Sequence, residues 1–163
     1  HLESLILKLE EMNVHMDIKA DSITVYGDHE LNATDIKTLP YPGFATDLQQ
    51  PLSALLTKCK GQSRIIETIY TERFRHCNEL NRMGADIDLL PATAIINGPS
   101  ELSGCDVKAT DLRGGASVVI AGLIANGNTI IHDIYHIDRG YDDIVGKLVN
   151  LGAKISRQVK DND

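Results

Sequence analysis

The apolar positions of this chain follow a pattern that occurs three times. In each copy an apolar residue is followed three positions later by another, then by a residue that tolerates positive φ, then by a small or β-branched residue. The copies are Leu9, Met12, Asn13, Val14; Leu80, Met83, Gly84, Ala85; and Leu148, Leu151, Gly152, Ala153. Each copy predicts an amphipathic helix that ends at Asn or Gly and leads into a strand.

A second part of the pattern recurs as well, so the repeating unit is longer than one helix. Residues 35–37 echo 106–108, residues 45–48 echo 109–112, and residues 69–70 echo 134–135. Over one full copy the pattern predicts strand 33–38, helix 48–60, strand 64–70, helix 76–83, and strands 85–90 and 93–97.

The copies on either side are predicted in the same way. The later copy reads as strand 105–108, helix 112–125, strand 128–134, helix 141–151 and strand 153–158. The earlier copy is truncated and begins with helix 2–12, followed by a hairpin of strands 14–19 and 22–27. Helix 2–12 has a wide apolar face, which predicts burial against a sheet or other helices.

These copies predict an α+β (mixed α/β) fold in one domain fragment, 1–163. It consists of a partial unit 1–30, a unit 31–100, a unit 101–158 and a tail 159–163. Such units are too long for a solenoid of short repeats. We expect them to pack as βαββαβ units around a pseudo-threefold axis, with helices inside and sheets outside (an inside-out α/β barrel or prism) and one unit incomplete.

Composition narrows the class of protein. The chain has 163 residues, 42% of them hydrophobic, and a net charge of −7, which disfavours binding along a nucleic-acid backbone. No apolar run approaches the roughly 20 residues of a membrane span, and no secretory signal is visible, so we expect a cytoplasmic protein without membrane contact. The three cysteines have no CxxC spacing and the six histidines no metal-ligand spacing, so we expect no metal and no cofactor.

Asp47 is the first candidate for chemistry, because a loop rich in Pro and Gly (residues 40–43) delivers it to a predicted helix start. Spacing alone favours a structural role: Thr46 and Gln49 fit a capping box, and an acid here complements the helix dipole. The functional alternative is a carboxylate at the mouth of a cleft that accepts a hydroxyl proton.

Three further places are open to two interpretations each. Small residues after Asp111 (residues 112–117) permit either tight helix packing, which spacing favours, or anion binding at a helix start. Arg139, in the segment 136–141, presents either a fork for a carboxylate or phosphate, or a surface side chain paired with Asp138 or Asp142. The mixed-charge segment 72–76 occupies the corresponding place in the preceding unit, where a solvated loop is favoured.

Four separated segments, in order, resemble the enolpyruvyl transferases, and within them the UDP-N-acetylglucosamine 1-carboxyvinyltransferases. They are PYPGFATDLQQP, IIETIYTERFRHCNELNRMGADI, ATDLRGGASVVIAGLIANG and IYHIDRGYDDIVGKLVNLGAKI. The resemblance covers essentially the whole chain and corresponds to the C-terminal part of such proteins. The related 3-phosphoshikimate 1-carboxyvinyltransferases share the fold but match TDLQ, RFRH and HIDRGYD less well.

The resemblance implies transfer of the enolpyruvyl group of phosphoenolpyruvate to the 3-hydroxyl of UDP-N-acetylglucosamine, the first step of peptidoglycan synthesis, in a cleft between two domains. It implies that Asp47 binds the 3-hydroxyl and acts as the base, and that Asp111 assists proton transfer. Ile69 is implied to contact the UDP-sugar and Arg139 the phosphoenolpyruvate carboxylate, with Arg113 a weaker candidate for the same anionic pocket. The reactive cysteine loop and the Lys-Asn pair of the family have no counterpart here, so the implied partner is a missing N-terminal catalytic domain.

Three hypotheses follow. The chain is most of one domain of such a transferase, inactive alone; or it is a separate, non-catalytic nucleotide-sugar binding module; or it is a structural protein that uses the fold for assembly. The truncated first unit favours the first hypothesis and predicts an uncovered apolar edge.

Overall fold

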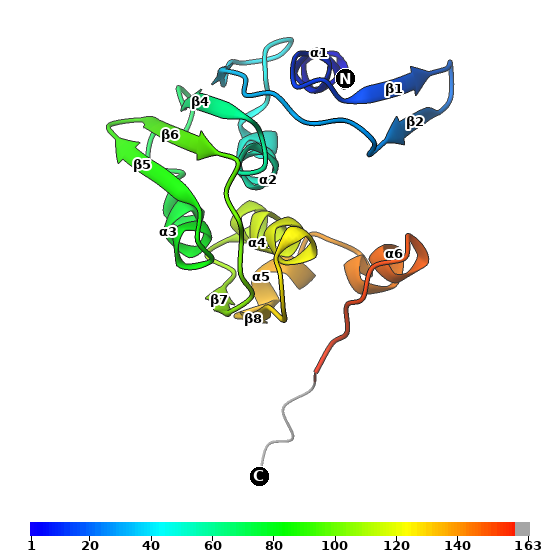
Figure 1. Cartoon of the computed structure of the whole chain (residues 1–163), viewed down its shortest axis with the longest axis vertical. Coiled ribbons are helices and arrows are strands. Elements are labelled where there is room, and N and C mark those ends of the chain that lie inside the picture. Colours follow the sequence, from blue (N-terminus) through cyan, green and yellow to red (C-terminus); the bar gives the residue numbers. More distant parts are fainter. Residues whose placement is uncertain (159–163) are drawn as a thin grey trace.

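A computed structural model describes residues 1–158, and its elements follow the predicted repeat (Figure 1). The helices are α1 (Glu3–Glu11), α2 (Thr46–Leu56), α3 (Arg75–Arg82), α4 (Leu112–Ile124), α5 (Tyr135–Asp138) and α6 (Ile144–Asn150). The strands are β1 (His15–Ile18), β2 (Ile23–Tyr26), β3 (Ile36–Lys37), β4 (Gly61–Ile66), β5 (Asp86–Leu90), β6 (Thr93–Gly98), β7 (Asp106–Lys108) and β8 (Ile130–His132).

The three predicted helix stops are confirmed, and all three have the same geometry. Asn13, Gly84 and Gly152 have φ values of 66°, 104° and 95°. In each copy the amide after this residue donates to a carbonyl five residues back, as Val14 N does to Leu9 O at 2.9 Å. This is the Schellman motif, which requires positive φ and therefore selects Gly or Asn.

The strands form three separate sheets. The largest has the order β3-β4-β6-β5, with β3 and β4 parallel and the other neighbours antiparallel. The parallel pair β7-β8 repeats the pairing of β3 with β4, and the hairpin β1-β2 repeats that of β5 with β6. The same two strand pairings therefore occur in successive units of the chain.

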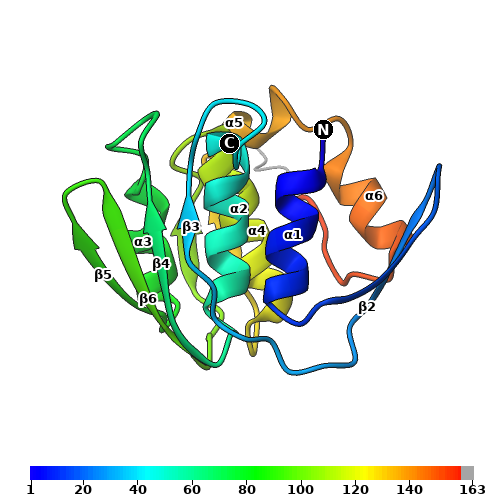
Figure 2. The ribbon, with the colours of Figure 1, turned by 90° about the horizontal axis from the view of Figure 1, so that it is seen from above.

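Helices α2 and α4 pack against each other and hold the core together. Figure 2 shows them in the middle of the molecule, with the four-stranded sheet on one side and the hairpin β1-β2 on the other. Fully buried core residues come from helices and sheet alike, among them Met12, Leu56, Ile65, Leu80 and Ile96.

Tight packing explains the small residues of α4. Gly114, Gly115, Ala116 and Ser117 are all buried. A Cβ on Gly115 would lie 2.5 Å from Ile137 Cγ1, closer than real Cβ contacts come. The packing interpretation of residues 112–117 is therefore confirmed.

The structure corrects several sequence expectations. Residues 153–158 form no strand; Ile155 packs on a small second core cluster with Ile137 instead. Helix 141–151 is shortened to α6, and the short helix α5 precedes it. The apolar face of helix α1 is buried only in part: Leu5 and Leu9 pack against the main core, whereas Leu7 is 58% exposed.

The C-terminal tail and the lengths of the helices complete the description of the fold. The tail 159–163 lies outside the described residues. Within residues 1–158, none of the helices has the length and hydropathy needed to cross a bilayer.

Candidate functional site

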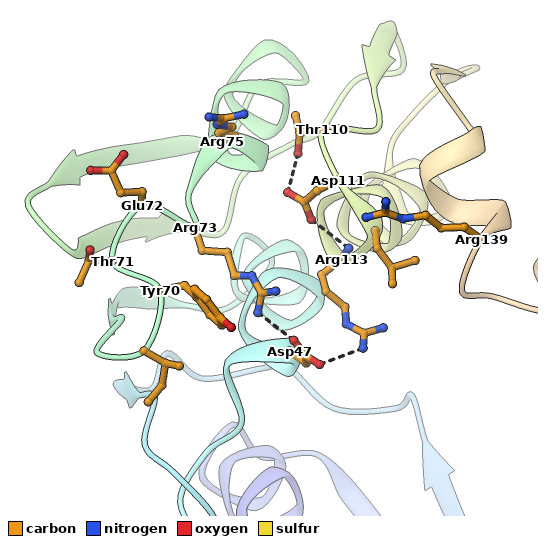
Figure 3. A pocket seen from close by; sticks show the side chains of 12 residues that line it. Asp47, Tyr70, Thr71, Glu72, Arg73, Arg75, Thr110, Asp111, Arg113 and Arg139 are labelled. Carbon is orange, nitrogen blue, oxygen red and sulfur yellow. Dashed lines mark hydrogen bonds and ion pairs between the residues drawn. The ribbon is translucent and has the colours of Figure 1, made fainter.

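A hollow of about 640 Å³ lies where the starts of α2 and α4 meet the loop before α3 and the end of α5 (Figure 3). The five site residues expected from the sequence all line it: Asp47, Ile69, Asp111, Arg113 and Arg139. Arg73 and Arg75 join them, so four guanidinium groups and two of the predicted carboxylates surround one space.

Asp47 stands in the first turn of α2 and is held between two arginines. Its Oδ1 accepts a hydrogen bond from Arg73 Nη1 at 2.8 Å, and its Oδ2 accepts one from Arg113 Nη2 at 2.9 Å. The carboxylate is nevertheless half exposed, so one side faces the hollow. The two arginines come from different repeat units, and Asp47 ties them together (Figure 3).

The hydrogen bonds between Asp47 and the two arginines favour the charged forms of Asp47 and Arg113. Hydrogen bonding to Arg113, assisted by Arg73, lowers the pKa of Asp47 despite an opposing contribution from partial burial. The same contact raises the pKa of Arg113, whose Nη1 also donates to the Tyr141 hydroxyl at 3.3 Å. Asp47 is therefore ionised and, while both arginines hold it, a weak base.

A buried carboxylate behind the hollow holds the loop that carries Ile69, Tyr70 and Arg73. Glu67 is 1% exposed, and its Oε1 accepts hydrogen bonds from the amides of Ile69 and Tyr70 at 2.9 and 3.1 Å. Its carboxylate also accepts hydrogen bonds from the hydroxyls of Thr38 and Thr46 at 2.6 and 2.9 Å. These hydrogen bonds outweigh desolvation and lower the pKa of Glu67, so a buried anion orders this wall.

Asp111 caps α4 and faces the hollow at the same time. Its Oδ1 accepts from the amides of Arg113 and Gly114 at 3.0 and 2.9 Å. Its Oδ2 accepts from Gln50 Nε2 at 3.2 Å. Desolvation opposes ionisation, but the hydrogen bonds outweigh it and lower the pKa of Asp111.

A buried polar chain continues behind Asp111. Gln50 Nε2 lies 3.3 Å from His76 Nδ1, and His76 Nε2 lies 2.7 Å from Ser53 Oγ. Ser53 Oγ donates to Gln50 O, so we assign the proton of the neutral ring to Nε2, which donates to Ser53. Burial lowers the pKa of His76 to about 4.

Arg139 is the C-cap residue of α5 and lines the same hollow as Asp47. The alternative of pairing with Asp138 or Asp142 is wrong, because these acids pair with Arg157 and Lys147. Among residues 1–158, no carboxylate lies within ion-pair distance of Arg139. Its exposed guanidinium thus leaves its donors for a ligand.

Two further expectations are corrected at the site. Segment 72–76 is not a solvated loop: Arg73 pairs with Asp47, and Phe74 and His76 are buried. Thr46 and Gln49 form no capping box, because Ala45 is the N-cap and the Thr46 hydroxyl donates to Glu67. Arg73 was not predicted as a site residue because its partner, Asp47, is 26 positions away. The only sequence signal for it is that segment 72–76 corresponds to the segment of Arg139 in the next unit.

The cysteines are not part of this site. Cys59 and Cys77 are fully buried, and burial raises their thiol pKa to about 11 and about 12. Such thiols are poor nucleophiles at neutral pH, as the sequence predicted.

The mixed α/β fold places four arginines and three acids, Asp47, Glu72 and Asp111, around one hollow. Such a lining is typical of proteins that bind anionic ligands. Comparisons with known proteins make the class specific. The sequence pattern of EPSP synthase (3-phosphoshikimate 1-carboxyvinyltransferase) matches residues 1–148. This chain therefore belongs to the EPSP synthase family, the enolpyruvyl transferases.

Two relatives illustrate the likeness of sequence. UDP-N-acetylglucosamine 1-carboxyvinyltransferase 2 of Clostridium tetani is 51% identical over 157 residues, which cover 96% of this chain and 38% of the relative. The protein of the same name from Listeria monocytogenes is 54% identical, with 96% and 37% covered. The chain thus spans less than two-fifths of these relatives.

Solved structures agree on the fold. The enolpyruvyl transferase NikO from Streptomyces tendae superposes with a TM-score of 0.87 at 30% identity, over 93% of this chain and 35% of NikO. EPSP synthase from Acinetobacter baumannii gives a TM-score of 0.62 at 22% identity over 85% of this chain and 36% of that protein, a likeness of fold alone.

Proposed function

We propose that this chain forms one wall of the active site of a UDP-N-acetylglucosamine 1-carboxyvinyltransferase. The reaction moves the enolpyruvyl group of phosphoenolpyruvate to the 3-hydroxyl of UDP-N-acetylglucosamine, releases phosphate and begins peptidoglycan synthesis. The observation that supports it most is the meeting of Asp47, Asp111, Arg113 and Arg139 around one hollow, in a chain whose relatives carry that name.

The residues divide the work of an addition and an elimination. Asp47 accepts the proton of the 3-hydroxyl while the hydroxyl oxygen forms a bond to the central carbon of phosphoenolpyruvate. At the same time the methylene carbon takes up a proton. Loss of a methyl proton then expels phosphate and restores the double bond. Asp111 assists proton transfer, Arg139 binds the carboxylate of phosphoenolpyruvate, Arg113 adds positive charge, and Ile69 contacts the UDP-sugar.

The geometry adds a requirement to this mechanism. While Arg73 and Arg113 hold Asp47, its low pKa opposes proton transfer from a hydroxyl. Turning Arg113 toward the anionic substrate frees Oδ2 and raises the pKa of Asp47 at the moment the base is needed. Arg113 therefore pairs with Asp47 before substrate binds and with the anionic substrate afterwards.

In this proposal the hollow has only one wall in this chain, so the reaction needs further groups from elsewhere. We propose that a second domain supplies the other wall, the general acid and the reactive cysteine, and that the function is cytoplasmic. Within this wall, the repeated pairings of β3-β4 with β7-β8, and of β5-β6 with β1-β2, support three units about a pseudo-threefold axis with helices inside.

Titration of the 163-residue chain with UDP-N-acetylglucosamine, followed by amide NMR shifts, tests the proposal. We expect weak, saturable binding that moves the amides of Asp47, Ile69 and Arg73. Asp47→Ala is expected to abolish the shifts, whereas Asp88→Ala, on the remote strand β5, is expected to preserve them.

The same experiment separates the alternatives. Binding of shikimate 3-phosphate in place of the nucleotide sugar favours the 3-phosphoshikimate 1-carboxyvinyltransferases. Absence of any saturable shift with both ligands contradicts a binding wall and favours a structural protein.

A further inference from the structure

Away from the hollow, one end of the hairpin β1-β2 gathers three side chains whose atoms suit a metal ion. His15 is the first residue of β1, and Asp28 and His29 follow the end of β2. One potential ligand atom from each of the three lies within 4.8 Å of the other two. All three side chains are exposed, so an ion reaches them from solvent.

The backbone holds these residues together, although 14 positions separate the two histidines. His15 is paired with Tyr26 in the hairpin register, and their rings lie 4.9 Å apart. The side chain of Asn13, the residue that ends α1, donates to Glu30 O at 2.9 Å. The segment that contains Asp28 and His29 is therefore fixed beside the start of β1.

The side chains already lie as neighbours. The rings of His15 and His29 meet edge to face with centroids 5.4 Å apart, and Asp28 Oδ1 lies 2.5 Å from His29 Nδ1. His15 and His29 also line a shallow hollow of about 280 Å³ together with Glu10, which adds a second carboxylate to the neighbourhood.

We propose that His15, Asp28 and His29 form a binding site for a divalent transition-metal ion, with Zn²⁺ as the best match. Two imidazoles and a carboxylate suit this ion, and water or Glu10 completes four-fold coordination. Bonds of about 2.0–2.1 Å in a tetrahedral site require ligand atoms roughly 3.4 Å apart. The potential ligand atoms lie within 4.8 Å of one another, and rotation of these exposed side chains brings them to the shorter separation.

The hairpin gives such an ion a structural effect. Seven of the eight residues of β1 and β2 are exposed, and the two strands form a sheet of their own. A two-stranded sheet without a covered face is marginally stable. An ion that joins the start of β1 to the segment after β2 closes the open end of the hairpin, opposite the turn, and stabilises it by mass action.

A second His–Asp contact in the chain provides the matched control. His132 Nε2 lies 2.7 Å from Asp106 Oδ1 across β7 and β8. It offers two groups where the proposed site offers three, and it is equally open to solvent. His1 provides another control, because its amino group and ring can chelate an ion independently of the hairpin.

Calorimetric titration of ZnCl₂ into the chain, without a polyhistidine tag, tests the proposal. We expect one ion per chain, with affinity at least tenfold weaker in His15→Ala and in His29→Ala and unchanged in His132→Ala and His1→Ala. Thermal unfolding without metal establishes that each variant is folded.

Hydrogen exchange supplies a local readout. Zn²⁺ is expected to slow amide exchange in residues 15–26 of the unmodified chain but not in His15→Ala. The proposal is overturned by the absence of binding, by equal affinity in His15→Ala, or by loss of binding in either control variant.

Discussion

Asp47 is the residue on which the charge balance of the hollow depends. Its carboxylate accepts hydrogen bonds from Arg73 and Arg113, which would otherwise repel each other. In the proposed function, a ligand hydroxyl competes with a guanidinium for the same carboxylate oxygen. This competition would couple ligand binding to the ionisation of Asp47.

Arg113→Gln is expected to raise the pKa of Asp47, because the contact that contributes most to its lowering is removed. A depressed carboxyl pKa contributes stability above the unfolded-state value, and this is lost as pH falls through the folded-state value. The variant should therefore lose stability at pH 7, by less than about 1 kcal/mol because the pair is partly exposed.

Carboxyl-carbon NMR titration of Asp47 measures this shift directly. Arg64→Gln, which removes an exposed arginine from β4 and leaves the hollow intact, is the control. An unchanged Asp47 titration in Arg113→Gln would contradict the coupling.

His76 predicts how the stability of the fold depends on pH. Burial lowers its pKa to about 4, whereas a histidine in an unfolded chain has a pKa of about 6.5. Between these values the unfolded state binds more protons, so the free energy of unfolding falls as pH falls. The loss from this one group amounts to up to about 3 kcal/mol.

Urea unfolding at pH 7 and pH 5 tests this expectation. His76→Gln cannot titrate in this range and should flatten the dependence, while the surface variant His132→Gln should keep it. Equal slopes in the unmodified chain and in His76→Gln would show that another group is responsible.

These residues also show how far sequence can predict a site. Asp47, Asp111 and Arg139 were predicted from family motifs, although spacing alone favoured structural roles for them. Arg73, Gln50 and His76 were not, because their contacts lie in other elements: Gln50 contacts His76, 26 positions away, and Asp111, 61 positions away. Such contacts exist only after the starts of α2 and α4 have been brought together.

At the scale of elements, the helix stops were predicted more accurately than the strands, whose existence and bounds depend on a neighbouring strand. The helix stops at Asn13, Gly84 and Gly152 are local, because a positive φ and two hydrogen bonds within one turn define them. A strand needs a neighbour, and residues 153–158 have the alternating pattern but no strand beside them in the described part of the chain. Asp143 is a typical N-cap residue for α6, but its left-handed backbone conformation was not predicted from the sequence.

Gly115→Ala is expected to destabilise the fold by about 1–3 kcal/mol, because the new methyl group would overlap Ile137 and push α5 away from α4. Gly122→Ala is the control in the same helix. There a Cβ meets Thr129 at 3.3 Å, and the gain in helix propensity offsets the mild contact.

Urea unfolding of both variants measures the difference. Displacement of α5 should also weaken ligand binding in Gly115→Ala, since Arg139 ends this helix. A Gly115→Ala protein as stable as Gly122→Ala would contradict the close packing of α4 against α5.

At the scale of the whole molecule, charged side chains make up most of the lining of the hollow, and four of them are arginines. The described residues provide the carboxylate of Asp47, which we propose as the base, a set of guanidinium groups, and buried anchors such as Glu67. Catalysis of the proposed reaction also needs an acid for the methylene carbon and the exclusion of water. We therefore expect this chain to bind a substrate without catalysing the reaction.

We predict that the 163-residue chain binds UDP-N-acetylglucosamine but releases no phosphate from phosphoenolpyruvate in its presence. Closure over the substrates requires a second wall, and the chain spans only 37–38% of the relatives it matches. A sensitive phosphate-release assay measures this, with the full-length Clostridium tetani relative as positive control and Asp47→Ala of this chain as background. Substrate-dependent release above that background would show that a single wall suffices for the chemistry.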